Sequence, residues 1–171
     1  MALPHNPTPY GLFGRDGEVA DVQCALNMPA VRAVITVGAP GIGKSAVAEA
    51  ALSRAAAAGT LTGRAQHRIG AVGDDLGPFL SALEQAVGAG LDLLHDPDAG
   101  LDLLARGLGP NAALLAQDSA GVFRLFRSLD PGEASSLRVN GERVFAAVFL
   151  VLRWLLGFGQ PVVLMIDDWG R

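Results

Sequence analysis

The sequence has little positive charge and a single cysteine. It contains 13 basic residues against 17 acidic ones, which gives a net charge of −4, and the arginines are scattered along the chain. Proteins that bind nucleic acid need a clustered basic face, so we expect no direct binding to nucleic acid. Cys24 cannot form an internal disulfide, and its place on an apolar helix face predicts a small core residue.

Long hydrophobic runs are also missing. The longest run, Val144–Leu152, is interrupted by Arg153 and is shorter than the roughly 18–20 residues that cross a bilayer. The N-terminal residues Met1–Asn6 lack the basic start and apolar stretch of a secretory signal. We therefore predict a cytoplasmic protein with no membrane partner.

Lysine is as scarce as cysteine, because Lys44 is the only lysine and the other 12 of the 13 Lys and Arg residues are arginines. It lies in Gly38–Ser45, GAPGIGKS, which matches the G-x-x-x-x-G-K-[ST] phosphate loop. Glycines let the backbone N–H groups turn toward a β-phosphate, and Lys44 would bridge the β- and γ-phosphates as a point charge. A planar guanidinium would not fit that narrow cradle. The predicted nucleotide-binding residues of this loop are Gly38, Ala39, Pro40, Gly41, Ile42, Gly43, Lys44, Ser45 and Ala46.

The segments around the loop fit a strand–loop–helix unit. Val31–Val37 is β-branched and almost wholly apolar, which predicts a central parallel strand. Ser45–Ala58 is rich in alanine and is followed by Gly59, which predicts a helix whose positive N-terminal end adds to the anion site. A further amphipathic helix is expected over Arg15–Met28.

An acidic pair follows the last apolar segment. Val162–Ile166 reads as a strand beside the phosphate-loop strand, and Asp167 and Asp168 would stand at its carboxyl end, where ligands bind in open α/β sheets. Asp167 would hold Mg²⁺ together with the Ser45 hydroxyl. Asp168 would orient the attacking water, so the predicted catalytic residues are Asp168 and Lys44. A water-positioning acid favours an ATPase over a kinase.

The middle of the chain contains segments with the pattern of a strand and segments with the 3.6-residue apolar repeat of a helix. We expect a second strand over residues 64–69 and a helix that opens at Pro78, and then short helices over 89–138. Residues 141–157 predict a helix apolar almost all round, and hence buried.

Together these elements predict an α/β fold of the P-loop NTPase type, with three layers and a parallel sheet. The segment 89–138 would be a helical insert between the second and third strands. Residues 1–11 would be a flexible lead-in to a domain over 12–171.

Three segments resemble one family. Leu12–Glu18, LFGRDGE, resembles the L-x-G-R-x-x-E motif of AAA-like and STAND-type regulatory ATPases. Gly77–Leu83 is similar to their P-F-x-x-x-L helix, and Glu142–Phe145 followed by Val162–Asp168 resembles their arginine-to-acidic-pair run. The resemblance implies an ATP-driven switch module of multidomain bacterial regulators. It also implies that Arg15 lies near the nucleotide base or the helix packed on it.

The resemblance favours ATP over GTP, and with Lys44 as the only lysine no N-K-x-D guanine motif exists. The sequence stops at Arg171, before any sensor strand, sensor arginine or effector domain. We therefore expect a fold incomplete at the C-terminus, weak hydrolysis, and a missing effector region or protein partner. One alternative is a non-hydrolysing interaction module, or a remnant of such a regulator, whose 89–138 helices bind a partner. A third is a small-metabolite kinase.

Overall fold

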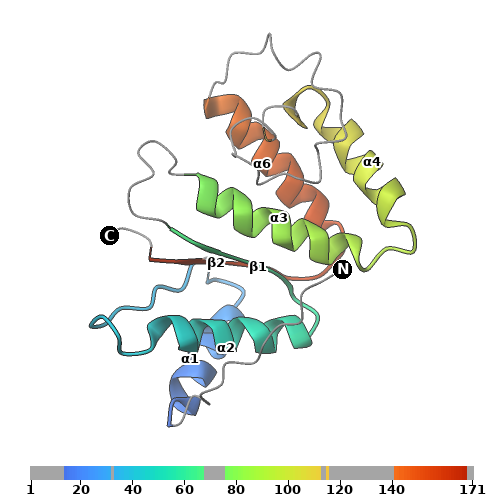
Figure 1. Ribbon diagram of the computed structural model, residues 1–171. Helices are drawn as coiled ribbons and strands as arrows, with labels where there is room; N and C mark the ends of the chain where they lie inside the picture. Colours follow the sequence, from blue (N-terminus) through green and yellow to red (C-terminus); the bar gives the residue numbers. More distant parts are fainter. Residues whose placement is uncertain (1–13, 32, 68–75, 113–114, 116–140, 169–171) are drawn as a thin grey trace. The chain divides into compact units, whose positions relative to one another are not determined.

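The computed structural model describes residues 14–31, 33–67, 76–112, 115 and 141–168, so the lead-in and most of the insert's second half lie outside the described residues. Contacts divide the chain into two compact units, residues 1–55 and 56–171. The described elements are helices and two strands, as in an α/β protein (Figure 1). The elements are α1 (Asp16–Leu26), α2 (Lys44–Ala57), β1 (Leu61–Gln66), α3 (Gly77–Leu91), α4 (Pro97–Leu108), α6 (Gly141–Leu156) and β2 (Val162–Asp167).

The first unit contains the two predicted helices, α1 and α2. They pack through a small cluster in which Val19, Val47 and Ala51 are buried. Arg54 of α2 forms an exposed ion pair with Asp16 of α1 at 3.4 Å. Such an exposed pair contributes little, so the apolar cluster is the main stabilising contact between the helices.

The prediction of a strand over Val31–Val37 is wrong for its described residues. Residues 33–39 have no regular secondary structure, and the side chains of Ile35 and Val37 are 83% and 88% exposed. β-Branched residues favour extended backbone, but a strand forms only where a neighbour supplies hydrogen bonds. Among the described residues, none of the backbone hydrogen bonds outside helices and strands involves 33–37, and β2 pairs with β1 instead.

The second unit contains a two-stranded parallel sheet. β1 and β2 run in register from Leu61 beside Val162 to Gln66 beside Asp167. Both strands were predicted, although β1 begins three residues earlier than expected. Leu61, Gly63 and Ala65 are buried, which gives β1 the alternation of a strand with one face on a core.

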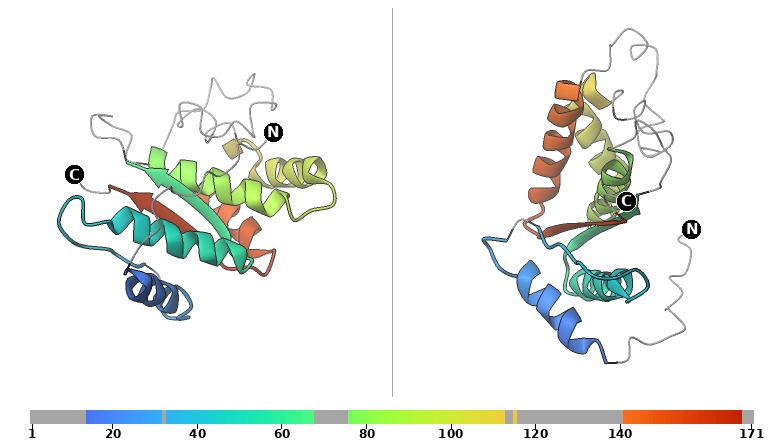
Figure 2. Two further views of the ribbon diagram at one scale, coloured as in Figure 1. Left: turned by 60° about the horizontal axis from the view of Figure 1, so that its bottom comes forward. Right: turned by 90° about the vertical axis from the view of Figure 1, so that its left-hand side faces the viewer.

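Helices cover one face of this sheet. α3 lies directly on the strands, and α4 and α6 pack against α3 and each other (Figure 1 and Figure 2). The core between them is aliphatic, with Leu80, Leu83, Val87, Val151 and Leu155 among its fully buried side chains. Its apolar burial provides the main free energy that holds this unit together.

The insert begins inside α3 and includes α4, a helix with a clear start. The Asp96 carboxylate accepts a hydrogen bond from the Ala99 N–H at 3.0 Å, and Pro97 follows as the first helical residue. Both features satisfy or remove donors that a helix N-terminus leaves unpaired. Helical backbone also occurs at Asn111, Ala112 and Leu115, and residues 116–138 of the insert lie outside the described part.

Two burial predictions are wrong. α6 is not buried all round, because Phe145, Phe149 and Leu156 are more than 60% exposed while Val144, Val151 and Leu155 are buried. Its apolar composition exceeds the single face that α3 and α4 can cover. Cys24 of α1 is exposed rather than in the core, because the α1–α2 cluster is built on Val19 and Val22.

Within the described residues, no helix is both long and apolar enough to span a membrane.

We predict that Gly63→Ala destabilises the protein by about 1–3 kcal/mol, the usual cost of overpacking. A Cβ atom there would lie 1.7 Å from the Ala82 carbonyl oxygen of α3, so strand and helix would have to separate. Chemical denaturation monitored by circular dichroism measures this loss. The control is Gly88→Ala on α3, whose Cβ would meet nothing within 4 Å. That change should raise stability by up to about 1 kcal/mol through helix propensity.

Candidate functional site

The phosphate-loop segment has the backbone conformation that its glycines predict. Gly41 and Gly43 have φ angles of +77° and +94°, in the left-handed range that side chains disfavour. A Cβ on Gly38 would come within 3.3 Å of the Ile42 side chain. The sequence therefore places glycine where the loop needs a special dihedral or close approach, which is the fit expected for a phosphate cradle.

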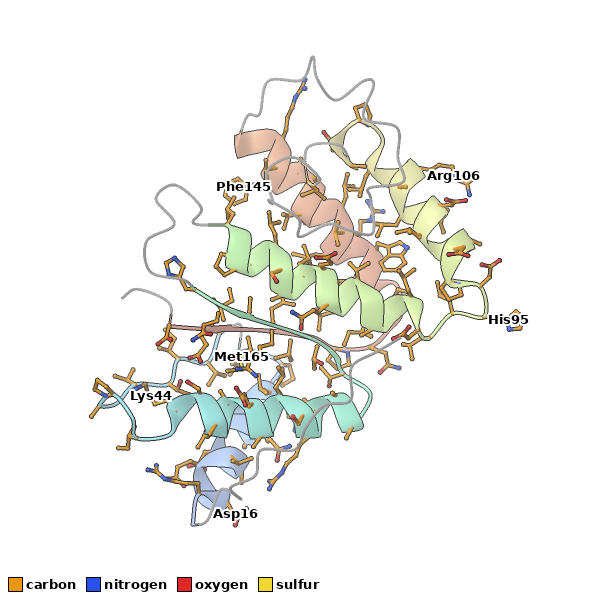
Figure 3. The ribbon with its side chains drawn as sticks, viewed as in Figure 1. Asp16, Lys44, His95, Arg106, Phe145 and Met165 are labelled. Carbon is orange, nitrogen blue, oxygen red and sulfur yellow. The ribbon has the colours of Figure 1, made fainter. Side chains whose placement is uncertain are left out.

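Lys44 is folded back over its own loop. Its Nζ donates hydrogen bonds to the backbone carbonyls of Gly38 at 2.9 Å and Ala39 at 3.0 Å. Figure 3 shows this side chain at the N-terminal end of α2. The ammonium is thus held against the first residues of the loop, in contact with carbonyl oxygens that a phosphate oxygen can replace.

Ser45 and Ala46 lie in the first turn of α2, which begins at Lys44, one residue earlier than predicted. Both are partly buried. The Val47 N–H donates to the Gly43 carbonyl at 3.0 Å, which closes the first turn of the helix. A helix N-terminus presents backbone N–H groups and a partial positive charge, so this end of α2 is suited to an anion.

Arg15 contacts the phosphate loop directly. One guanidinium nitrogen donates to the Ile42 carbonyl at 2.9 Å, and the other forms a 2.9 Å ion pair with Glu18 of α1. The pKa of the Glu18 carboxyl is lowered, chiefly by a backbone hydrogen bond, with a further contribution from Arg15 that opposes partial desolvation. A carboxyl with a lowered pKa is ionised at neutral pH, so Arg15 has a charged anchor.

The acidic pair lies at the carboxyl end of β2, as predicted. Asp167 is the last strand residue, and its carbonyl accepts from the His67 N–H at 2.9 Å. Asp168 has a φ of +56°, and its N–H donates to the Asp167 carboxylate at 3.0 Å. Positive φ at an aspartate is uncommon and is often found at functional turns.

Gln66 contacts the acidic pair, and the sequence did not indicate it as a candidate site residue. Its side-chain amide donates to the Asp168 carboxylate at 3.1 Å from the last residue of β1. The parallel register sets Gln66 beside Asp167, and that register depends on which strands pair. A polar residue at the end of a strand was the only available signal, and by itself it is too common to select Gln66.

The remaining predicted contacts belong to two different units. Ser45 lies in the first and Asp167 in the second, so their shared Mg²⁺ site stays a prediction. No group of three or more histidine, cysteine or acidic side chains that could hold a metal ion occurs among the described residues.

Comparison with known families assigns the chain. The family model described as the AAA ATPase domain matches residues 11–171, which cover the phosphate loop, the insert and the acidic pair. The chain belongs to the AAA ATPase domain family. No curated protein and no solved structure gives a significant match. As a member of this family it is a nucleotide-binding ATPase module with an α/β P-loop fold, which confirms the predicted fold class and the AAA-like resemblance.

We predict that this AAA ATPase domain tolerates Asp168→Asn but not Asp168→Val. Asparagine adopts positive φ readily, whereas a β-branched side chain at φ +56° costs about 1–3 kcal/mol. Thermal unfolding should therefore leave the asparagine variant near the parent protein and lower the valine variant. Equal stability of the two variants would contradict the left-handed turn.

Proposed function

We propose that this domain binds ATP with Mg²⁺ and belongs to a STAND-type regulatory or signalling protein, in which nucleotide acts as a switch. The observation that carries the proposal is the Lys44 ammonium, held at 2.9 and 3.0 Å from carbonyls of a loop with two left-handed glycines. A chain that otherwise uses arginine keeps lysine at this position. A compact ammonium suits the phosphate chain of a nucleotide.

Different residues would bind the phosphates and the Mg²⁺ ion. Gly38–Ala46 would surround the phosphates with backbone N–H groups, and Lys44 would exchange its carbonyl contacts for phosphate oxygens. Ser45 and Asp167 offer the hard oxygen ligands that suit Mg²⁺. The ion would neutralise negative charge on the phosphates when bound.

Asp168 supports ATP hydrolysis over phosphoryl transfer to a metabolite. The Gln66 amide holds one carboxylate oxygen at 3.1 Å, which fixes the direction of the group. A fixed carboxylate can accept a hydrogen bond from an attacking water, as a hydrolytic site requires. The alternatives are an interaction module without hydrolysis and a small-metabolite kinase. A complete lack of phosphate release from Mg·ATP would favour them over an ATPase.

We predict that Lys44→Ala weakens Mg·ATP binding about ten- to hundredfold, since it removes a charge-assisted contact worth about 1.5–3 kcal/mol. Isothermal titration calorimetry measures both affinities. The control is Arg106→Ala on α4, which removes one positive charge whose Nε donates to the Asp102 carbonyl of the same helix at 3.2 Å. Equal affinities for the parent protein and the Lys44 variant would remove the nucleotide proposal.

We also predict slow hydrolysis by this chain, well below the roughly 1–10³ s⁻¹ of typical enzymes. An arginine near the γ-phosphate can speed phosphoryl transfer by 10³-fold or more. The Arg15 guanidinium is engaged with Ile42 and Glu18. Phosphate release with Mg·ATP measures the rate, and Asp168→Asn should lower it further. Several turnovers per second, abolished in Asp168→Asn, would contradict the prediction of weak activity.

A further inference from the structure

Arg15 connects the start of α1 to the phosphate loop at Ile42. Its guanidinium bonds the Ile42 carbonyl and the Glu18 carboxylate at 2.9 Å each, and its side chain is 35% exposed. Ile42 lies between the two left-handed glycines, Gly41 and Gly43. The contact is therefore made at the residue flanked by the two positive φ angles of the loop.

A bond to the Ile42 carbonyl also sets the direction of the next N–H group. The Ile42–Gly43 peptide is trans, so the Ile42 C=O and the Gly43 N–H point in opposite directions within one rigid plane. Glycines on both sides impose little restraint on that plane, because their backbone is the most permissive. A guanidinium that holds the carbonyl on one side directs the Gly43 N–H to the other side.

We propose that Arg15 is a positioning residue for the phosphate cradle and does not read the base: by holding the Ile42 carbonyl, it orients the Gly43 N–H toward the phosphate chain of the ligand. Glu18 anchors the guanidinium from the first turn of α1. This inference rests on the proposed nucleotide function. It makes Arg15 act on the phosphate chain whatever base the ligand carries.

The test compares two ligands that share phosphates and differ in the base, Mg·ATP and Mg·tripolyphosphate, by displacement of a fluorescent ATP analogue. Arg15→Ala should weaken the binding of both ligands by the same factor, about tenfold. That factor is expected for loss of one charge-assisted hydrogen bond, the one from the Gly43 N–H to the phosphate chain. Arg15→Lys should give an intermediate loss of affinity, because an ammonium keeps the charge but lacks the planar fork that bonds both Ile42 and Glu18. The matched control is Arg54→Ala, which removes a guanidinium of α2 that bonds Asp16 of α1 and does not contact the loop in the described residues.

A second measurement needs no nucleotide. Amide hydrogen exchange of Gly43 in the free protein should be faster in Arg15→Ala than in the parent protein or in Arg54→Ala, because the peptide plane is no longer held. A purely structural role for Arg15 would instead lower the thermal midpoint and speed exchange across α1 and α2 together.

The outcomes separate the two proposals. If the parent protein binds no Mg·ATP, the proposed function fails, and unchanged Gly43 exchange in Arg15→Ala overturns the inference by itself. If the parent protein binds Mg·ATP and Arg15→Ala loses ATP but keeps tripolyphosphate, Arg15 reads the base or ribose and the inference is wrong. Unchanged affinity for both ligands also overturns it.

Discussion

The parallel pairing of β1 with β2 is the interaction on which most of the described structure depends. It joins Gln66 to the acidic pair at one end and provides the surface that α3 covers. The approach of α3 is close enough that only glycine fits at position 63, against the Ala82 carbonyl. A larger side chain at position 63 would push α3 away from the sheet and so disturb the core and the acidic pair together.

The outer edge of β1 shows how this small sheet satisfies its backbone. Leu61 and His67 direct their N–H groups to Pro161 and Asp167, so the N–H and carbonyl of Arg64 face the other edge. There the side-chain amide of Gln85 accepts from the Arg64 N–H at 3.2 Å and donates to the Arg64 carbonyl. One α3 side chain thus takes the place of a neighbouring strand and covers an edge that could otherwise recruit another chain.

The candidate site divides into parts that the sequence predicted well and parts that it did not. The loop glycines, Lys44 and the position of Asp167 and Asp168 follow from local patterns, because the dihedrals and charges they need are properties of single residues in a fixed spacing. The Arg15 contact with Ile42 and the Gln66 contact with Asp168 join residues 27 and 102 positions apart. No short window of sequence contains both partners of either contact.

The sequence by itself determined which segments are helices, where β1 and β2 lie to within a few residues, and that a phosphate loop precedes α2. Periodicity, caps and glycine placement act over a few residues, so they are readable from the chain alone. The tertiary structure decided that Val31–Val37 does not pair as a strand over its described residues, that α6 keeps Phe145 and Phe149 exposed, and that Gln66 meets Asp168. Those outcomes depend on which partner each surface finds, because pairing and burial are relations between distant segments and apolar composition alone does not specify the partner.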